Sequence, residues 1–212
     1  MKDKIVIIGG GGHAKVLISI IKKINAYEII GYCDIKNNGN ILGIKYIGND
    51  NGLEKIISKY PKCSAIIGIG KTNTKNDIRK NVFDNLTKLG FNIQTIISPD
   101  SLVNEETKID KGTVVFDSVT INSGTIIGYN CIINTGAVIE HDCIIGNNVF
   151  IGPNATINGK VTIESNSFIG SNSTIIQNVS ICSNSLVGAG SVVINSIYKP
   201  GVYVGNPVRK IK

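Results

Sequence analysis

The chain has 212 residues, which leaves room for one long or two small domains, and a formal net charge of +7. Its lysines are scattered, without a basic helix or an aromatic stripe, so the charge argues against nucleic-acid binding and suits an anionic ligand. No apolar run reaches the roughly 18 residues of a membrane span, and the first one is too short for a signal peptide. The five cysteines are an odd number without C-x-x-C spacing, which argues against a disulfide framework and favours a cytoplasmic protein.

The first part of the chain alternates predicted strands with predicted helices. A buried-strand run at 5–8 leads into four glycines, and a helix follows with apolar residues at 14, 17, 21 and 24. Later come a strand at 29–33, a helix near 52–60, a strand at 64–69, a helix at 77–89 with Ile78, Val82, Leu86 and Leu89 on one face, and a strand at 92–97. This alternation predicts an α/β domain over residues 1–97, with a small Rossmann-like parallel sheet.

The turn after the first strand has a nucleotide-binding pattern. Gly9, Gly11 and Ala14 match G-x-G-x-x-A between a strand and a helix, where backbone N–H groups and the helix dipole favour a phosphate. Asp34 ends the second strand and is placed to bind a ribose or sugar hydroxyl. The sheet is too small for a second mononucleotide-binding half, so a nucleotide-linked sugar fits better than a dinucleotide cofactor. The alternative is a tight turn without a ligand.

The second part of the chain repeats every six residues. From Ile97 to Val193, every sixth residue is Ile or Val, and we call these residues the anchors. The residue two positions before each anchor, from Ser101 to Ser191, is always Ser, Thr, Ala, Cys or Val. Three residues after the anchors, from Gly112 to Gly190, eleven of fourteen positions are Gly or Asn, the residues that best tolerate positive φ. This pattern predicts a left-handed parallel β-helix of hexapeptide repeats over residues 98–212, with eighteen residues per coil and a C-terminal tail. Cys131 and Cys143 fall in the small column and are expected to be buried.

A candidate catalytic group lies within the repeats. His141 points outward, and Gly159 follows it by eighteen residues, so the two are expected to stack about 4.8 Å apart on adjacent coils. A histidine beside bare glycine backbone offers a base and an N–H donor, which acyl transfer requires. Asp142 is a candidate to orient the imidazole, although its place in the Gly/Asn column has a backbone explanation too, and Glu140 is the other candidate. A β-helix carbonic anhydrase needs three metal-binding histidines, and this β-helix has one, so no metal is expected.

Three segments resemble the bacterial sugar O-/N-acetyltransferases, which include enzymes that acetylate nucleotide-linked 4-amino sugars and the related sialic acid O-acetyltransferases. They are Gly9-Gly10-Gly11-Gly12-His13, the segment with Asn134-Thr135 and Ile139-Glu140-His141-Asp142, and Val204-Gly205-Asn206-Pro207. The similarity covers essentially the whole chain. It implies a homotrimer with active sites between subunits and acetyl-CoA as co-substrate.

The resemblance also implies roles for individual residues. His141 would be the general base and Asp142 its acidic partner. The nucleotide-linked sugar would contact Gly11, Gly12, His13, Asp34 and Lys36. The coenzyme would contact Phe150, Gly159, Ser171 and Ala189. Phe150 departs from many relatives, which carry a second histidine there, because a phenyl ring covers the pantetheine but donates no hydrogen bond.

We therefore predict an enzyme that moves an acetyl group from acetyl-CoA to the amine of a nucleotide-linked 4-amino-4,6-dideoxy sugar in bacterial surface glycan biosynthesis. One alternative is O-acetylation of a sialic-acid-type hydroxyl. Another is a non-catalytic trimer that binds a sugar nucleotide. No cysteine is placed to form an acyl-enzyme.

Overall fold

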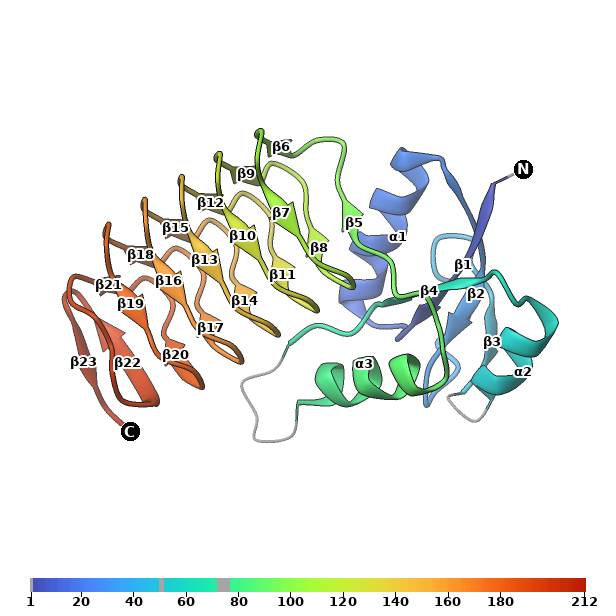
Figure 1. Cartoon of the computed structure of the whole chain (residues 1–212). Helices are drawn as coiled ribbons and strands as arrows, with labels where there is room; N and C mark the ends of the chain where they lie inside the picture. Colours follow the sequence, from blue (N-terminus) through green and yellow to red (C-terminus); the bar gives the residue numbers. More distant parts are fainter. Residues whose placement is uncertain (1, 50–51, 72–76) are drawn as a thin grey trace. The chain divides into compact units, whose positions relative to one another are not determined.

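The computed structural model describes residues 2–49, 52–71 and 77–212 (Figure 1). The chain divides into two compact units, Met1–Ser98 and Pro99–Lys212. Among the described residues, no helix is both long and apolar enough to cross a membrane.

The first unit is built on a four-stranded parallel sheet in the order β3-β2-β1-β4. Its central strand β1 is apolar on both faces, and Ile5 to Ile8 are at most 1% exposed, as expected for a parallel sheet covered on both sides. The elements in chain order are β1 (Asp3–Ile8), α1 (Gly12–Ile24), β2 (Tyr27–Cys33), β3 (Tyr46–Gly48), α2 (Leu53–Lys59), β4 (Ser64–Ile67), α3 (Ile78–Lys88) and β5 (Ile96–Ile97). The predicted Rossmann-like sheet is confirmed.

Two predictions for this unit were wrong in detail. The predicted strand at 92–97 is reduced to β5 and a single bridge between Ile93 and Ala65, and the short edge strand β3 was not predicted. The buried face of α3 is formed by Arg79, Phe83 and Leu86, whereas Ile78 is 52% exposed. The apolar pattern did not predict the buried face of α3, because the Arg79 guanidinium donates hydrogen bonds to carbonyl oxygens inside the unit. These hydrogen bonds reduce the cost of burying its charge.

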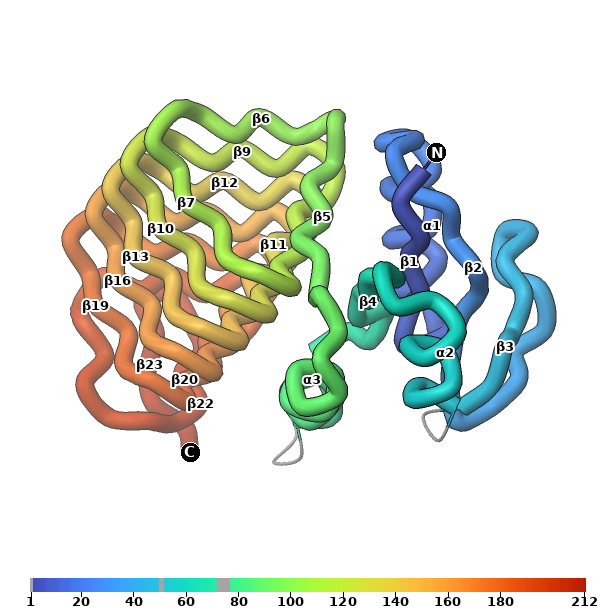
Figure 2. The backbone as a smooth tube through the Cα atoms, turned by 45° about the vertical axis from the view of Figure 1, so that its right-hand side comes forward, coloured from blue at the N-terminus to red at the C-terminus, as the bar shows by residue number. Residues whose placement is uncertain are grey.

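The second unit is a parallel β-helix whose short strands form three faces (Figure 2). The first face contains β6 (Leu102–Val103), β9 (Thr120–Ile121), β12 (Val138–Ile139), β15 (Thr156–Ile157), β18 (Thr174–Ile175) and β21 (Val192–Val193). The second contains β7 (Lys108–Ile109), β10 (Ile126–Ile127), β13 (Ile144–Ile145), β16 (Thr162–Ile163) and β19 (Ser180–Ile181). The third contains β8 (Val114–Val115), β11 (Ile132–Ile133), β14 (Phe150–Ile151), β17 (Phe168–Ile169), β20 (Ser185–Val187), β22 (Gly201–Gly205) and β23 (Val208–Lys210).

The hexapeptide prediction is confirmed. Each strand pairs in parallel with a strand one coil away, so that paired residues are eighteen positions apart, as in the pair Ile127–Ile145. The Ile and Val anchors from Val115 to Val193 are at most 1% exposed, and Cys131 and Cys143 are fully buried. The first predicted anchor, Ile97, is instead 37% exposed, because no further coil of the β-helix precedes it.

The turn column adopts positive φ throughout. All fourteen positions from Gly112 to Gly190 lie in the left-handed region, including Ser118, Asp142 and Lys160, which are neither Gly nor Asn. The corner geometry therefore overrides the residue preference at Ser118 and Lys160, whereas Asp tolerates the left-handed region.

Candidate active site

A glycine-rich turn joins β1 to α1 in the first unit. β1 ends at Ile8 and α1 begins at Gly12, so the turn lies where the G-x-G-x-x-A pattern predicts it. The helix has no side-chain N-cap and no acidic residue in its first turn. Its first N–H groups are therefore suited to an anion, and the helix dipole favours negative charge at the same place. A Cβ added at Gly11 or Gly12 would meet nothing within 4 Å, so the approach to this helix end is open.

Gly9 lies where this turn meets the segment that follows β4. Its φ is +108°, and an added Cβ would stand 2.6 Å from Cγ1 of Ile69 and 3.0 Å from the carbonyl carbon of Gly68. Glycine alone tolerates both the conformation and the approach. The glycine-rich turn and the segment 68–70 thereby form two walls of one pocket.

The pocket measures about 330 Å³ and lies at the carboxyl ends of β1, β2 and β4, where open α/β sheets bind ligands. It is lined by 9–13, Asp34, Ile35, 68–70, Ile78 and Val82. Apolar side chains from the loop after β2 and from α3 thus face a polar floor of backbone amides. This combination suits a ligand with an apolar ring and a negatively charged group.

Asp34 and Lys36 have different places in this unit. Asp34 Oδ2 accepts the Gly10 N–H at 2.6 Å, so the carboxylate ties the end of β2 to the glycine-rich turn as well as lining the pocket. Lys36 is exposed in the following loop and does not line the pocket.

His13 lies at the start of α1 and lines the same pocket. Burial, and secondarily the nearby Arg79 guanidinium, lowers the pKa of His13 to about 3. The imidazole is therefore neutral at physiological pH and brings no positive charge to the pocket.

Sequence reasoning missed Tyr32 and Arg79. The Tyr32 side chain is fully buried, and its hydroxyl accepts the Asn38 N–H at 2.9 Å and donates to the Gly39 carbonyl at 2.8 Å, which shapes the loop after β2. Arg79 is 1% exposed on α3. Positions 79, 83 and 86 have helical spacing and lie on one face of α3. A hydrophobicity pattern does not reveal this face, because one of its three residues is a charged arginine.

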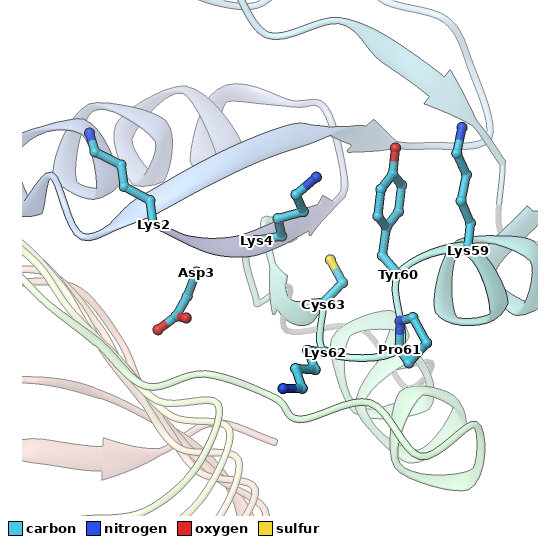
Figure 3. Close-up of a pocket in the computed structure, with 8 residues that line it drawn as sticks. All are labelled: Lys2, Asp3, Lys4, Lys59, Tyr60, Pro61, Lys62 and Cys63. Carbon is cyan, nitrogen blue, oxygen red and sulfur yellow. The ribbon is translucent and has the colours of Figure 1, made fainter.

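A second cavity of about 430 Å³ lies at the amino-terminal ends of β1 and β4, around Lys2–Lys4 and Lys59–Cys63 (Figure 3). Lys4, Tyr60 and Lys59 stand in a row, with both ammonium groups over the Tyr60 ring at 4.6 and 5.4 Å from its centroid. Burial raises the pKa of the Cys63 thiol to about 11, so it is a thiol rather than a nucleophilic thiolate at neutral pH. The Cys63 thiol of this cavity is therefore not suited to nucleophilic group transfer.

His141 lies in the second unit, on the edge of the β-helix between β12 and β13. Its Nδ1 is 2.9 Å from Asp142 Oδ2, and both side chains are 56% exposed. Glu140 instead accepts a hydrogen bond from Asn122 Nδ2 at 2.8 Å, so Asp142 is the carboxylate that meets the imidazole. Asp142 also has a φ of 58°, so both explanations considered for it, turn geometry and imidazole partner, apply at once.

Gly159 lies directly beneath the imidazole, on the next coil. A Cβ added to it would stand 2.7 Å from His141 Nε2 and 2.9 Å from Cε1. Within the described residues, the Gly159 N–H donates to no other group. With Nδ1 directed to Asp142, the Nε2 lone pair is the basic site, and it lies beside an unused backbone donor.

The coenzyme candidates occupy other parts of the β-helix. Phe150 on β14 stacks on Phe168 of β17, with ring centroids 4.5 Å apart and planes 13° apart. Ser171 and Ala189 lie one coil apart on the edge between the third and first faces, after β17 and β20 respectively. His141 and Gly159 lie on the edge between the first and second faces, after β12 and β15. One chain therefore brings His141, Asp142 and Gly159 together, but it does not bring them to the edge that carries Ser171 and Ala189.

Both units match known protein families. The profile of the PglD N-terminal domain matches residues 4–86. The profile of the bacterial transferase hexapeptide (six repeats) matches 124–159, and the hexapeptide repeat of succinyl-transferase matches 160–194. A comparison with curated protein sequences gives no match.

Three solved structures resemble the chain over nearly its full length. PerB from Caulobacter crescentus, in complex with CoA and GDP-perosamine, is 30% identical with a TM-score of 0.91, over 99% of this chain and 97% of that one. A perosamine N-acetyltransferase variant from the same organism, also with CoA and GDP-perosamine, is 28% identical with a TM-score of 0.91 over the same shares of the two chains. The acetyltransferase domain of PglB from Neisseria gonorrhoeae is 29% identical with a TM-score of 0.92, over 99% of this chain and 100% of that one. With its PglD-type domain, its hexapeptide repeats and these full-length similarities, the chain belongs to the bacterial sugar acetyltransferases of the hexapeptide-repeat type.

Proposed function

We propose that this protein transfers the acetyl group of acetyl-CoA to the amine of a nucleotide-linked 4-amino sugar, with His141 as the general base. The observation that carries the proposal is the arrangement at one corner of the β-helix, where Asp142, His141 and the unused Gly159 N–H form a continuous group. The full-length similarity to PerB, solved with CoA and GDP-perosamine, supports the choice of substrates.

The reaction follows from the two nitrogen atoms of the imidazole. The sugar amine attacks the thioester carbonyl carbon while His141 Nε2 removes a proton from the amine. Asp142 holds the ring and stabilises the imidazolium through Nδ1–H. We assign stabilisation of the developing oxyanion to the Gly159 N–H. Collapse of the tetrahedral intermediate forms the amide and releases the coenzyme A thiolate, which takes the proton from Nε2.

The two units then have separate tasks. The pocket of the first unit holds the nucleotide through the open amides at Gly11 and Gly12, the neutral His13 and the Asp34 carboxylate. The β-helix holds the coenzyme along Phe150, Ser171 and Ala189. Because the edge with Ser171 and Ala189 is not the edge with His141, we propose a homotrimer in which one subunit's coenzyme edge faces the His141 edge of its neighbour. We place the reaction in the cytoplasm, where acetyl-CoA is made.

The test is release of thiol from acetyl-CoA in the presence of a panel of UDP-, GDP- and dTDP-linked 4-amino sugars and free sialic acids. We expect release with a nucleotide-linked 4-amino sugar, and its loss in His141→Ala.

Asp142→Asn keeps a residue suited to positive φ but removes the charge, so kcat should fall by about 10- to 100-fold, toward the low end of typical general-base contributions. Glu140→Gln is the matched control and should retain most activity.

Other outcomes separate the alternatives. Thiol release only with a sialic acid would assign O-acetylation to the same site. Binding of a nucleotide without any thiol release would indicate a non-catalytic sugar-nucleotide-binding protein. Equal activity of His141→Ala and the unaltered protein would remove the general-base role.

A further inference from the structure

The side chain of Arg79 is buried in the first unit although it carries a permanent positive charge. It is 1% exposed, in the first turn of α3. Its Nη1 donates to the carbonyl oxygens of Ile67 and Ile69, each at 2.8 Å. A buried guanidinium is costly unless strong acceptors compensate for lost water. The two carbonyls supply part of that compensation, so their positions and the position of the guanidinium depend on one another.

These two carbonyls define the path of the pocket wall. Ile67 is the last residue of β4, and Ile69 belongs to the segment 68–70 that lines the pocket. A planar guanidinium that bridges two carbonyls on either side of Gly68 restricts the backbone between them more than a point charge does. Arg79 itself does not line the pocket.

The wall is packed against the glycine-rich turn with little spare room. The Gly68 N–H donates to the Ile8 carbonyl at 2.7 Å. A Cβ added to Gly68 would lie 3.0 Å from the Ala14 Cβ and 3.1 Å from the Gly9 oxygen. One added to Gly70 would lie 3.8 Å from the His13 ring. Movement of the wall therefore changes the position of the turn, of α1 and of His13 together.

We infer that Arg79 is a positioning residue for the nucleotide-linked sugar, because its buried guanidinium holds the 68–70 wall against the glycine-rich turn and so preorganises the pocket. The inference rests on the proposed function of this pocket. The Coulomb effect of Arg79 on the neighbouring His13 is a second sign that the guanidinium lies near the ligand position. Its positive charge also favours a phosphate at the open end of α1.

The experiment compares Arg79→Lys and Arg79→Gln in the full-length protein. We expect Arg79→Gln to raise the KM for the nucleotide-linked sugar about 10- to 100-fold, because misplacing a binding wall by about 1 Å has effects of this size. The kcat and the KM for acetyl-CoA should stay within about twofold of their original values, since the β-helix is untouched. Arg79→Lys should give a smaller rise in KM, because an ammonium keeps the charge but not the planar bridge.

Leu86→Ala is the matched control for simple destabilisation. Leu86 is fully buried on the same helix but is not part of the pocket lining, so its truncation should lower Tm without the change in KM. Amide hydrogen exchange gives a second measurement, with faster exchange expected at 67–70 in the Arg79 variants only. If Arg79→Gln and Leu86→Ala lower Tm equally and raise the KM equally, Arg79 has only a structural role.

Direct titration with UDP, GDP and dTDP distinguishes this inference from the proposed function. If the unaltered protein binds none of these nucleotides, the assignment of the pocket is wrong and the inference falls with it. If the unaltered protein binds one of them and Arg79→Gln binds it equally well, the assignment stands and only the role of Arg79 is overturned. Should Arg79→Gln fail to fold, the same comparison is made with Arg79→Lys.

Discussion

Two neighbours define the orientation of the His141 imidazole. Nδ1 faces the Asp142 carboxylate, and Nε2 faces the backbone of Gly159 on the next coil. Both side chains are more than half exposed, so their contact alone adds little to stability. The value of the arrangement is chemical, because it fixes which nitrogen carries the lone pair.

Gly159→Ala tests the orientation of the His141 imidazole by adding one methyl group beside it. The new methyl group would lie 2.7 Å from Nε2, so the ring must move away from the position it now occupies. We expect kcat to fall about 100-fold, as for other misplacements of about 1 Å in an active site. Tm should be nearly unchanged, because the exposed His141 side chain can move away from the new methyl group. Steady-state kinetics and thermal unfolding measure the two effects, and full activity in Gly159→Ala would show that the imidazole works from another position.

The elements of the second unit are too small to be stable alone. Its strands from β6 to β19 have two residues each, and each becomes part of a continuous core only by stacking on the coils before and after it. The stability of the unit therefore resides in the repeated anchors rather than in any single strand.

Ile145→Ala and Ile144→Ala test this at adjacent positions of β13. Ile145 is 1% exposed in the core and Ile144 is 52% exposed on the outer face. We expect the Ile145 variant to lose about 2–5 kcal/mol of unfolding free energy, because the surrounding coils cannot close the cavity. The Ile144 variant should change by no more than about 0.5 kcal/mol. Denaturant unfolding at fixed oligomeric state measures both, and equal losses would argue against a core built on the anchors.

On the scale of the whole molecule, the net positive charge comes from the first part of the sequence. Residues 1–98 contain 15 Lys and Arg against 7 Asp and Glu, whereas residues 99–212 contain 7 against 8. The entire net charge of +7 therefore belongs to the unit proposed to bind the nucleotide-linked sugar. A positive unit raises the local concentration of an anionic diphosphate and speeds its association.

Salt should therefore affect the two substrates unequally. Raising the ionic strength from about 0.05 M to about 0.5 M shortens the screening length several-fold. We expect the KM of the nucleotide-linked sugar to rise severalfold and the KM of acetyl-CoA, proposed to bind the β-helix, to rise less. Initial rates at several salt concentrations measure both values, and an equal rise would mean that the charge of the first unit does not steer its substrate.

The β-helix was predictable because its contacts repeat along the sequence. Each anchor stacks on the residue eighteen positions away, so one period describes the core, the corners and the stacking of His141 on Gly159. The glycine-rich turn was predictable for a similar reason, since a strand, four glycines and a helix follow each other directly. In both cases the interactions that decide the structure join residues at fixed separations.

Other features depended on contacts at irregular separations. The sequence by itself favoured Asp142 over Glu140 as the partner of His141. The tertiary structure adds the contacts, with Asp142 Oδ2 2.9 Å from His141 Nδ1 and Glu140 accepting from Asn122 on the preceding coil. It also buried Arg79 of α3 in place of the expected Ile78, because the carbonyls of Ile67 and Ile69 accept its hydrogen bonds. A repeat pattern determines what is periodic, but the partner of a polar group is settled only when the folded chain brings a donor and an acceptor within reach.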